Sequence, residues 1–355
     1  MSKQIVSIPG VRCLIAIVVL AAPLSSCWAQ TRLSVDEAVR QALEARPLIK
    51  AEAERVTAAE AMKVQAGLRP NPEFQFQEEN LRPGQTYSRD VDTLAFFIQP
   101  LDILGKRKQR IAAARETVTA TKTEYELARW RIAQSVKLAY WQARGAQEIH
   151  DALLRTIDNF GRIVNYTQAQ FSVGDIAEQD LMRVRLEGER LKITADLAAI
   201  DFNHARVELL RQMGRTTFSD PVTLTEVFAP DQSIAPLPIK QVLGQRIDVA
   251  VARAALSQGE ANAKLQDVLA RPDLSVTYGY KRTQLPDAIT GVNTALAAVT
   301  VSIPISDRNQ GNRAAAAAEL RRRQDLLAEA EAQARADYAA ALEEYQARKI
   351  ELTDT

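Results

Sequence analysis

Residues 106–172 read KRKQRIAAARETVTATKTEYELARWRIAQSVKLAYWQARGAQEIHDALLRTIDNFGRIVNYTQAQFS, and the chain from there to Gly214 contains no proline. Apolar or small side chains recur every seven residues along this stretch, at Ile111, Val118, Tyr125, Ile132, Ala139, Ala146, Leu153 and Phe160. A heptad repeat of that length is typical of a coiled coil and predicts one helix about 100 Å long. Such a helix needs a packing partner along its whole length.

The obvious partner is a second helix over residues 177–213, folded back by a turn at Gly174. Its apolar residues form two rows that are roughly 200° apart around the helix. One row is Val184, Leu191, Ala198 and Ala205, and the other is Leu186, Ile193, Ile200 and Val207. A helix with two apolar sides has two neighbours, so the pattern favours a closed ring of helices over a free-standing hairpin.

The first 29 residues are predicted to be an export signal, because basic residues precede an apolar run, residues 14–22, that is too short to span a bilayer. Two processing reactions remain open. In the first, the lipobox-like motif LSSC directs acylation of Cys27. In the second, a signal peptidase cleaves the ordinary small-residue site before Gln30. The only other cysteine is Cys13, inside the signal, so no disulfide framework is expected.

After the signal, the sequence predicts a helix from Ser34 to about Gly67. The motif SVDE supplies a capping box at its start, and two prolines end it. Two runs with alternating character follow, Glu73–Gln77 and Thr93–Ile98, and both predict short β-strands. Pro100 ends the second strand, and the long helix follows it closely.

The same order of elements recurs in the second half. The predicted elements are a helix over 239–269, strands over 274–281 and 297–303, and a helix from 311 onward. Matching prolines lie 202 residues apart before the strands (70 and 272) and 204 apart after them (100 and 304). We interpret this spacing as an internal duplication.

The duplication sets the expected domain boundaries. The first repeat covers 30–220, a proline-rich linker covers 221–238, and the second repeat covers 239–355. On the spacing of the first half, the second repeat would reach its helical turn near residue 378. We therefore expect the chain to be truncated, with the second repeat incomplete.

Composition and motifs exclude several classes of function. The chain has 355 residues with 45 Lys and Arg against 44 Asp and Glu, a balance that argues against nucleic-acid binding. No catalytic or cofactor-binding motif is present, so no enzyme and no cofactor are expected. His150 and His204 lie alone on long helices without a second ligand at metal-binding spacing, so no metal site is expected either.

Four short strands in an exported chain suit an outer-membrane barrel better than a soluble helical protein with a small side sheet. Four strands cannot close, because known barrels of this type begin at about eight. Several copies must each contribute a sheet, and three copies would give twelve strands.

Five short motifs together resemble the TolC-like outer membrane efflux protein family, especially its cobalt-zinc-cadmium resistance (CzcC-type) branch. They are Pro70-Asn71-Pro72-Glu73, Gln99-Pro100-Leu101, Gly105-Lys106-Arg107, Val173-Gly174 followed by Asp180-Leu181, and Asp307-Arg308-Asn309-Gln310-Gly311. The resemblance covers Leu33 to the C-terminus. It implies a mainly α fold with β: long coiled-coil helical hairpins, and four strands per copy in a trimeric 12-stranded outer-membrane barrel continued by an α-helical periplasmic tunnel.

The resemblance also implies partners and a passive transport function. A homotrimer in outer-membrane lipid would dock onto a periplasmic adaptor and an inner-membrane pump of the resistance-nodulation-division type. It would then conduct exported solutes, most plausibly divalent heavy-metal cations. Export of drugs or type I secretion through the same tunnel is the alternative within transport. A periplasmic adaptor protein is the alternative of another class.

Two groups of residues are candidate sites. Val173, Gly174, Asp175, Ile176, Asp180 and Leu181 form the predicted periplasmic tip, where the resemblance implies contact with the adaptor. Lys106, Arg107, Lys108 and Arg110 form a basic cluster at the start of the long helix. That cluster is either an ordinary solvated face or a contact with anionic lipid headgroups at the inner edge of the outer membrane.

Overall fold

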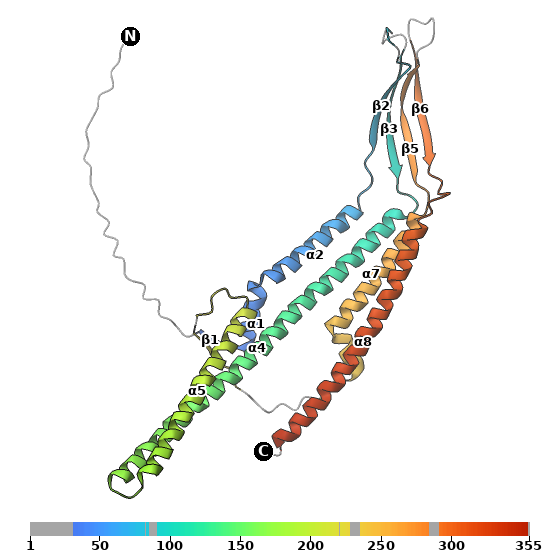
Figure 1. The fold of residues 1–355 in the computed structure, drawn as a ribbon. Helices are drawn as coiled ribbons and strands as arrows, with labels where there is room; N and C mark the ends of the chain where they lie inside the picture. The colour runs from blue at the N-terminus through green and yellow to red at the C-terminus, as the bar shows by residue number, and fades with distance from the viewer. Residues whose placement is uncertain are drawn as a thin grey trace, which may run out of the picture.

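The computed structural model of the protein describes residues 31–81, 83–84, 91–219, 221–227, 235–283 and 291–353. These residues form an elongated molecule (Figure 1). A four-stranded sheet stands at one end, long helices run down from it, and a helical hairpin forms the opposite end.

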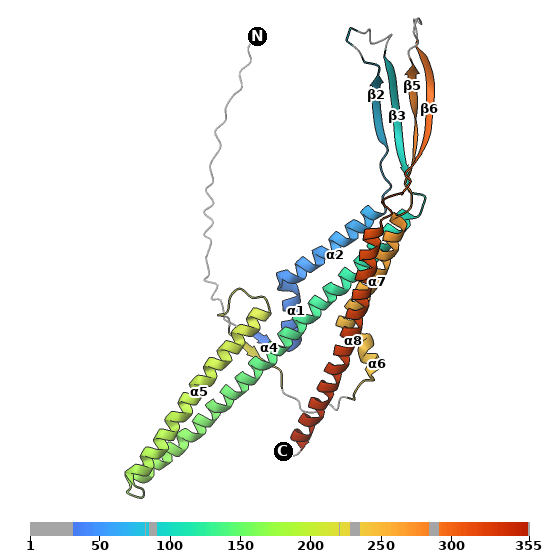
Figure 2. The ribbon, with the colours of Figure 1, turned by 45° about the vertical axis from the view of Figure 1, so that its right-hand side comes forward.

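The hairpin consists of α4, Lys106–Ser172, and α5, Glu178–Gln212, which lie side by side in Figures 1 and 2. Both helices have the predicted extent to within one residue. Gly174 ends α4 with a positive φ of 83°, and the amide of Asp175 donates to the carbonyl of Gln170 at 3.0 Å. This is the Schellman arrangement, in which glycine takes the left-handed conformation without a Cβ penalty.

The first helical segment is divided in two. α1 is Val35–Ala45 and α2 is Pro47–Ala66, so the prediction of one helix from Ser34 to about Gly67 is wrong at Arg46, whose φ is −69° and ψ is 123°. The reason is Pro47, because a residue before proline is driven out of the α region. The predicted cap is confirmed, since the amide of Glu37 donates to Ser34 Oγ at 3.3 Å.

The large sheet has the order β2-β3-β5-β6, and all neighbouring strands are antiparallel. Its strands are β2 Glu73–Glu79, β3 Asp92–Leu101, β5 Leu274–Thr283 and β6 Val292–Val301. The four predicted strands are therefore present, but their bounds differ. The predicted strand for β6 began five residues late. Its ladder with β5 starts where Val292 pairs with Thr283, but the apolar alternation in the sequence becomes visible only later in the strand.

A second, small sheet pairs β1, Thr31–Leu33, with β4, Val222–Leu224, in parallel. The irregular linker predicted over 221–238 is therefore wrong at β4. Sequence alone gave no signal for this strand, because its partner is 191 residues away along the chain (222 minus 31).

The main core lies where this small sheet meets α1, α4 and α5. It contains Leu33, Ala38, Ala42, Ile49, Ile132, Val136, Ala139, Tyr140, Ala143, Leu209, Leu210, Met213 and Leu224. Side chains of α4 also bind the backbone of β1, of β4 and of the segment that follows β4. Tyr140 Oη donates to the carbonyl of Leu33 at 2.8 Å, Arg144 Nε donates to the carbonyl of Glu226 at 2.6 Å, and Gln147 Oε1 accepts from the amide of Leu224 at 3.1 Å.

The second repeat contains α6 Ile239–Gln245, α7 Ile247–Leu269 and α8 Gln310–Thr353. The prediction of one helix over 239–269 is therefore wrong at Arg246, where the backbone is extended. Its backbone follows the path of the first repeat. Arg246 has the same φ and ψ as Arg46, and the residue before α8, Asn309, has a positive φ of 56° where Gly105, before α4, has 85°. Gly105 and Asn309 are 204 residues apart, the same offset as the prolines that close the strands.

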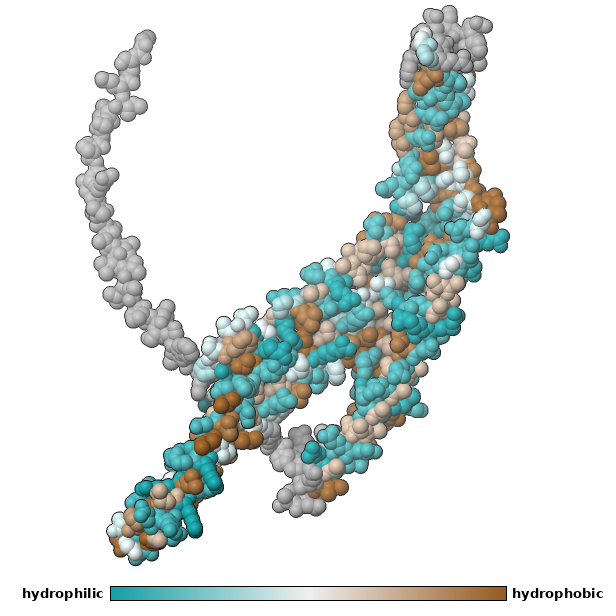
Figure 3. Space-filling model, in the orientation of Figure 1, coloured by the Kyte–Doolittle hydropathy of each residue, from teal (hydrophilic) through white to brown (hydrophobic). Residues whose placement is uncertain are grey.

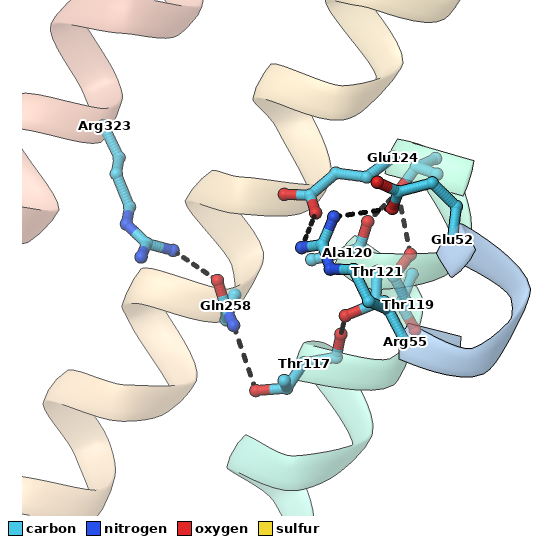
Figure 4. Close-up of polar contacts among 10 residues, drawn as sticks. Glu52, Arg55, Thr117, Thr119, Ala120, Thr121, Glu124, Gln258 and Arg323 are labelled. Atoms are coloured by element: carbon cyan, nitrogen blue, oxygen red, sulfur yellow. Dashed lines mark hydrogen bonds and ion pairs between the residues drawn. The ribbon is translucent and has the colours of Figure 1, made fainter. Parts of the chain in front are cut away.

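Polar side chains connect the helices of the two repeats beneath the sheet (Figure 4). Arg323 of α8 donates to Gln258 Oε1 of α7 at 2.8 Å, and Gln258 Nε2 donates to Thr117 Oγ1 of α4 at 3.0 Å. On the other side of α4, Arg55 of α2 donates to Glu124 at 2.8 Å. These contacts fix α2, α7 and α8 around the upper part of α4.

Candidate functional site

One face of the large sheet is apolar and aromatic. The register places Phe74, Phe97, Tyr278 and Ala297 in one row across the four strands, with ring centroids 5.2 Å apart for Phe74 and Phe97 and 5.8 Å apart for Phe97 and Tyr278. Because side chains alternate along a strand, Phe76, Val276, Tyr280, Val299 and Val301 share this face. Phe74 and Val299 are more than half exposed, so no segment that the structure describes covers this surface.

The opposite face is mixed in character. β2 contributes Glu73, Gln75, Gln77 and Glu79, and Glu79 lies 4.0 Å from Lys281 Nζ of β5. β3 is apolar on this side too, and Phe96 packs so closely on Gly279 that a Cβ at that position would come within 2.4 Å of the Phe96 Cβ. A sheet with one apolar and one largely polar face can separate a hydrocarbon layer from water.

The basic cluster lies at the base of the sheet, where α4 begins, and three of its four members bond within the chain. Lys106 Nζ pairs with Asp273 at 2.7 Å, Arg107 Nε donates to the carbonyl of Gly67 at 2.6 Å, and Arg110 pairs with Asp102 at 2.7 Å. Lys108 is exposed. Three of the four basic side chains thus stabilise the strand-to-helix junction. The sequence alone could not show whether these side chains bond within the protein or face solvent.

The predicted tip residues lie together at the end of the hairpin, but they differ in exposure. Val173 is 72% exposed, and Gly174, Asp175 and Asp180 are exposed as well. Leu181 is 3% exposed, so it stabilises the hairpin from inside rather than offering a surface.

Sequence reasoning missed other apolar side chains at this end. Met182 is 58% exposed next to the buried Leu181, and Tyr166 and Phe171 of α4 are exposed too. Figure 3 shows hydrophobic patches among the polar residues at this end of the molecule. Helical periodicity could have predicted the exposure of Met182. It directly follows Leu181, which is buried in the hairpin, and successive helical residues point about 100° apart.

The two apolar rows of α5 have different environments. Ala198 of the first row is buried and Val184, Leu191 and Ala205 are half-buried in the hairpin, whereas all four residues of the second row are exposed. The second row therefore still lacks the neighbour that its composition predicts.

Within the described residues, no group of three or more His, Cys, Asp or Glu side chains could hold a metal ion. His150 lies 3.7 Å from Asp151, and His204 is exposed. The predicted signal and the lipidation candidate Cys27 lie outside the described residues. In the part of the chain that the structure describes, no helix has the length and apolar content required to cross a bilayer.

Comparison with known proteins gives consistent matches. Residues 38–214 match the family described as outer membrane efflux protein. The cobalt-zinc-cadmium resistance protein CzcC of Cupriavidus metallidurans is 26% identical over 280 residues, which make up 79% of this chain and 65% of that protein. The chain therefore spans about two thirds of the length of this relative.

Two solved structures share the fold. CusC superposes with a TM-score of 0.68 at 19% identity, covering 92% of this chain and 79% of that one. The outer membrane protein VceC of Vibrio cholerae superposes with a TM-score of 0.64 at 16% identity, covering 90% and 80%. The expected fold class, mainly helical with four strands and a long helical hairpin, is thereby confirmed.

Proposed function

Because the chain belongs to the outer membrane efflux protein family, we propose that it is the outer-membrane channel of a tripartite efflux system. Proteins of this family lie in the outer membrane and extend into the periplasm. The observation that supports the channel is the amphipathic sheet standing on helices long enough to reach across a wide aqueous space.

The channel is built from three copies. β2 and β6 are the edge strands, and within the described residues neither pairs with a further strand on its outer side. Exposed edges are closed in stable proteins, and three sheets of four strands make a barrel of twelve. The exposed second row of α5 then packs against a helix of a neighbouring copy, which closes the helical tunnel.

The cargo is a divalent heavy-metal cation, passed through the tunnel without covalent chemistry. The support is the likeness to CzcC, a cobalt-zinc-cadmium resistance protein. The test is a deletion strain carrying the wild-type gene or an empty vector, with tolerance to zinc, cobalt, cadmium and nickel measured beside tolerance to drugs. Loss of metal tolerance alone is the expected result. Unchanged metal tolerance with reduced drug tolerance would replace the metal cargo by organic compounds.

The hairpin tip is the contact site for the periplasmic adaptor, and the adaptor connects the channel to an inner-membrane pump of the resistance-nodulation-division type. Exposed apolar side chains at the end of a hairpin, Val173 and Met182, suit a helical partner that buries apolar anchors. The charged residues Asp175 and Asp180 surround them, and Leu181 supports the tip from within.

Charge introduced at the anchors tests this contact. Val173→Asp and Met182→Asp should reduce crosslinking to the adaptor and metal tolerance together. Asp158→Asn, on an exposed side chain of α4 outside the tip, is the matched control and should change neither. Normal crosslinking in both Asp variants would remove the tip from the interface.

A further inference from the structure

Four large aliphatic side chains are exposed directly beneath the large sheet. They are Leu68 at 53%, Ile103 at 66%, Ile303 at 74% and Ile305 at 73%, and we call them the collar. They come from three separate segments, after α2, after β3 and after β6, which meet at the base of the strands (Figures 1 and 2). Exposed aliphatic residues from separate segments at one level indicate a surface that something covers.

The collar continues the apolar face of the sheet. Ile303 is two residues beyond Val301, and the amide of Ser302 still donates to the carbonyl of Asp273, so the alternation of β6 extends past its last ladder pair. Ile103 is likewise two residues beyond Leu101, which shares the apolar face with Leu274. In Figure 3 hydrophobic surface extends from the strands onto the segment that follows β6.

Positive charge surrounds the collar. The junction segments 67–69, 102–110, 271–273 and 302–309 contain seven Lys and Arg residues and three Asp residues. Asp102 and Asp273 are already paired with Arg110 and Lys106, while Lys108 and Arg308 are exposed. The side chains left facing solvent therefore carry excess positive charge, which fits an anionic surface.

We propose that the collar and these cations form a lipid-anchoring ring in the periplasmic leaflet of the outer membrane. The aliphatic side chains enter the acyl region, and Lys108 and Arg308 contact the phosphates of anionic phospholipids. This proposal rests on the channel function only in requiring that the sheet be inserted. Of the basic cluster expected from sequence it retains Lys108 alone, because the other three members are bonded within the protein. Arg308 is exposed, and its Nε donates to the carbonyl of the collar residue Ile305 at 3.3 Å.

The depth of the collar in a bilayer can be measured with nitroxide labels. The only cysteines of the chain are Cys13 and Cys27, so single cysteines can be introduced by Ile103→Cys, Ile303→Cys and Ile305→Cys, with the unsubstituted protein as the labelling blank. The assembled protein is placed in vesicles of phosphatidylethanolamine and phosphatidylglycerol at 3:1. Collision rates with oxygen, which concentrates in the acyl region, and with a water-soluble nickel chelate are then compared.

All three collar labels should be accessible to oxygen and protected from the chelate. Tyr278→Cys on the sheet face should behave in the same way, and Val173→Cys at the tip should behave in the opposite way. If the chelate reaches the collar labels while the Tyr278→Cys label stays protected, the lipid-anchoring ring is excluded and the proposed channel function is unaffected. A Tyr278→Cys label that the chelate reaches would instead overturn insertion of the sheet.

The charged part of the ring has its own test. Lys108→Gln should weaken the preference of the inserted protein for phosphatidylglycerol over phosphatidylethanolamine by about fivefold at that site, since one Lys near an anionic surface contributes on the order of 1 kcal/mol. Lys192→Gln, on the exposed surface of α5, is the control and should have no effect. An equal lipid preference of the wild type and Lys108→Gln at low salt would remove Lys108 from the ring.

Discussion

Arg46 and Arg246 interrupt the helices of the two repeats with the same backbone angles, yet different contacts surround them. The side chain of Arg46 packs against Gly214 at the end of α5, where an added Cβ would lie 2.9 Å from Arg46 Cγ. Arg246 instead pairs with Asp248 and, at 2.8 Å, with Asp337 of α8. The two halves share a backbone path. Buried apolar side chains stabilise the first half, whereas hydrogen bonds and ion pairs between polar side chains connect the helices of the second.

The same contrast holds for the whole repeats. The main core belongs to the first repeat and β4, whereas α8 contacts mainly α7 and, farther along, α6 (Figure 1). A shared backbone path therefore does not require shared packing. The contrast can be tested by substitutions in the two halves that should have different effects.

The largest effect is expected in the core of the first repeat. Leu209→Ala removes a fully buried side chain and should lower the free energy of unfolding by about 2–5 kcal/mol, measured by urea denaturation in detergent. Leu326→Ala on α8, where the side chain is half-exposed, should change it by less than about 0.5 kcal/mol. Equal losses would show that the two repeats are packed alike.

A smaller effect is expected at the polar connection in Figure 4. Gly259 lies under Arg323, and a Cβ there would come within 2.8 Å of Arg323 Cδ, so Gly259→Ala should displace the guanidinium from Gln258. We expect a loss of about 1–3 kcal/mol in unfolding free energy, because charged hydrogen bonds are broken. Gly145→Ala, in open space on α4, should instead raise stability by about 0.4–1 kcal/mol.

The residue before each long helix permits an exchange between repeats. Gly105→Ala should cost about 1–2 kcal/mol, because φ is +85° there and a Cβ is disfavoured in the left-handed region. Gly105→Asn, which installs the residue found at the equivalent position 309, should cost less, since asparagine tolerates this conformation. Thermal unfolding of both variants shows which one loses more stability. A Gly105→Asn variant as unstable as Gly105→Ala would contradict the prediction.

The smallest expected effect is a pH dependence of the local stability of the second repeat. The guanidinium of Arg246 lowers the pKa of Asp248 and the pKa of Asp337 below their usual values. A lowered pKa means that the contribution to stability is present above the ordinary pKa near 4 and is lost as the pH falls through the folded-state value.

The protection factors of amides in α6 and the adjoining part of α8, which are corrected for the intrinsic exchange rate, should therefore fall below about pH 4, while those of the core around Leu209 change less. Asp337→Asn should remove part of that fall. An unchanged pH profile in this variant would show that the ion pair does not hold α8 in place.

Local rules of the sequence predicted much of this fold. The heptads predicted α4 to the residue, Ser34 predicted the cap of α1, and the prolines predicted the offset between the two pairs of strands. The tip was also predictable, because Gly174 follows an uninterrupted helix. The exposed Met182 and the collar were not, since an apolar residue in sequence does not reveal whether its side chain is covered.

By itself, the sequence determined the long helices, the four main strands and the family, because each depends on residue type and spacing within short segments. Only the tertiary structure decided the pairing of β1 with β4, the engagement of Lys106, Arg107 and Arg110 within the junction, and the exposure of the collar. These features depend on contacts between segments far apart in the chain. Whether a given side chain finds a distant partner follows from the geometry of the folded chain and not from local propensity.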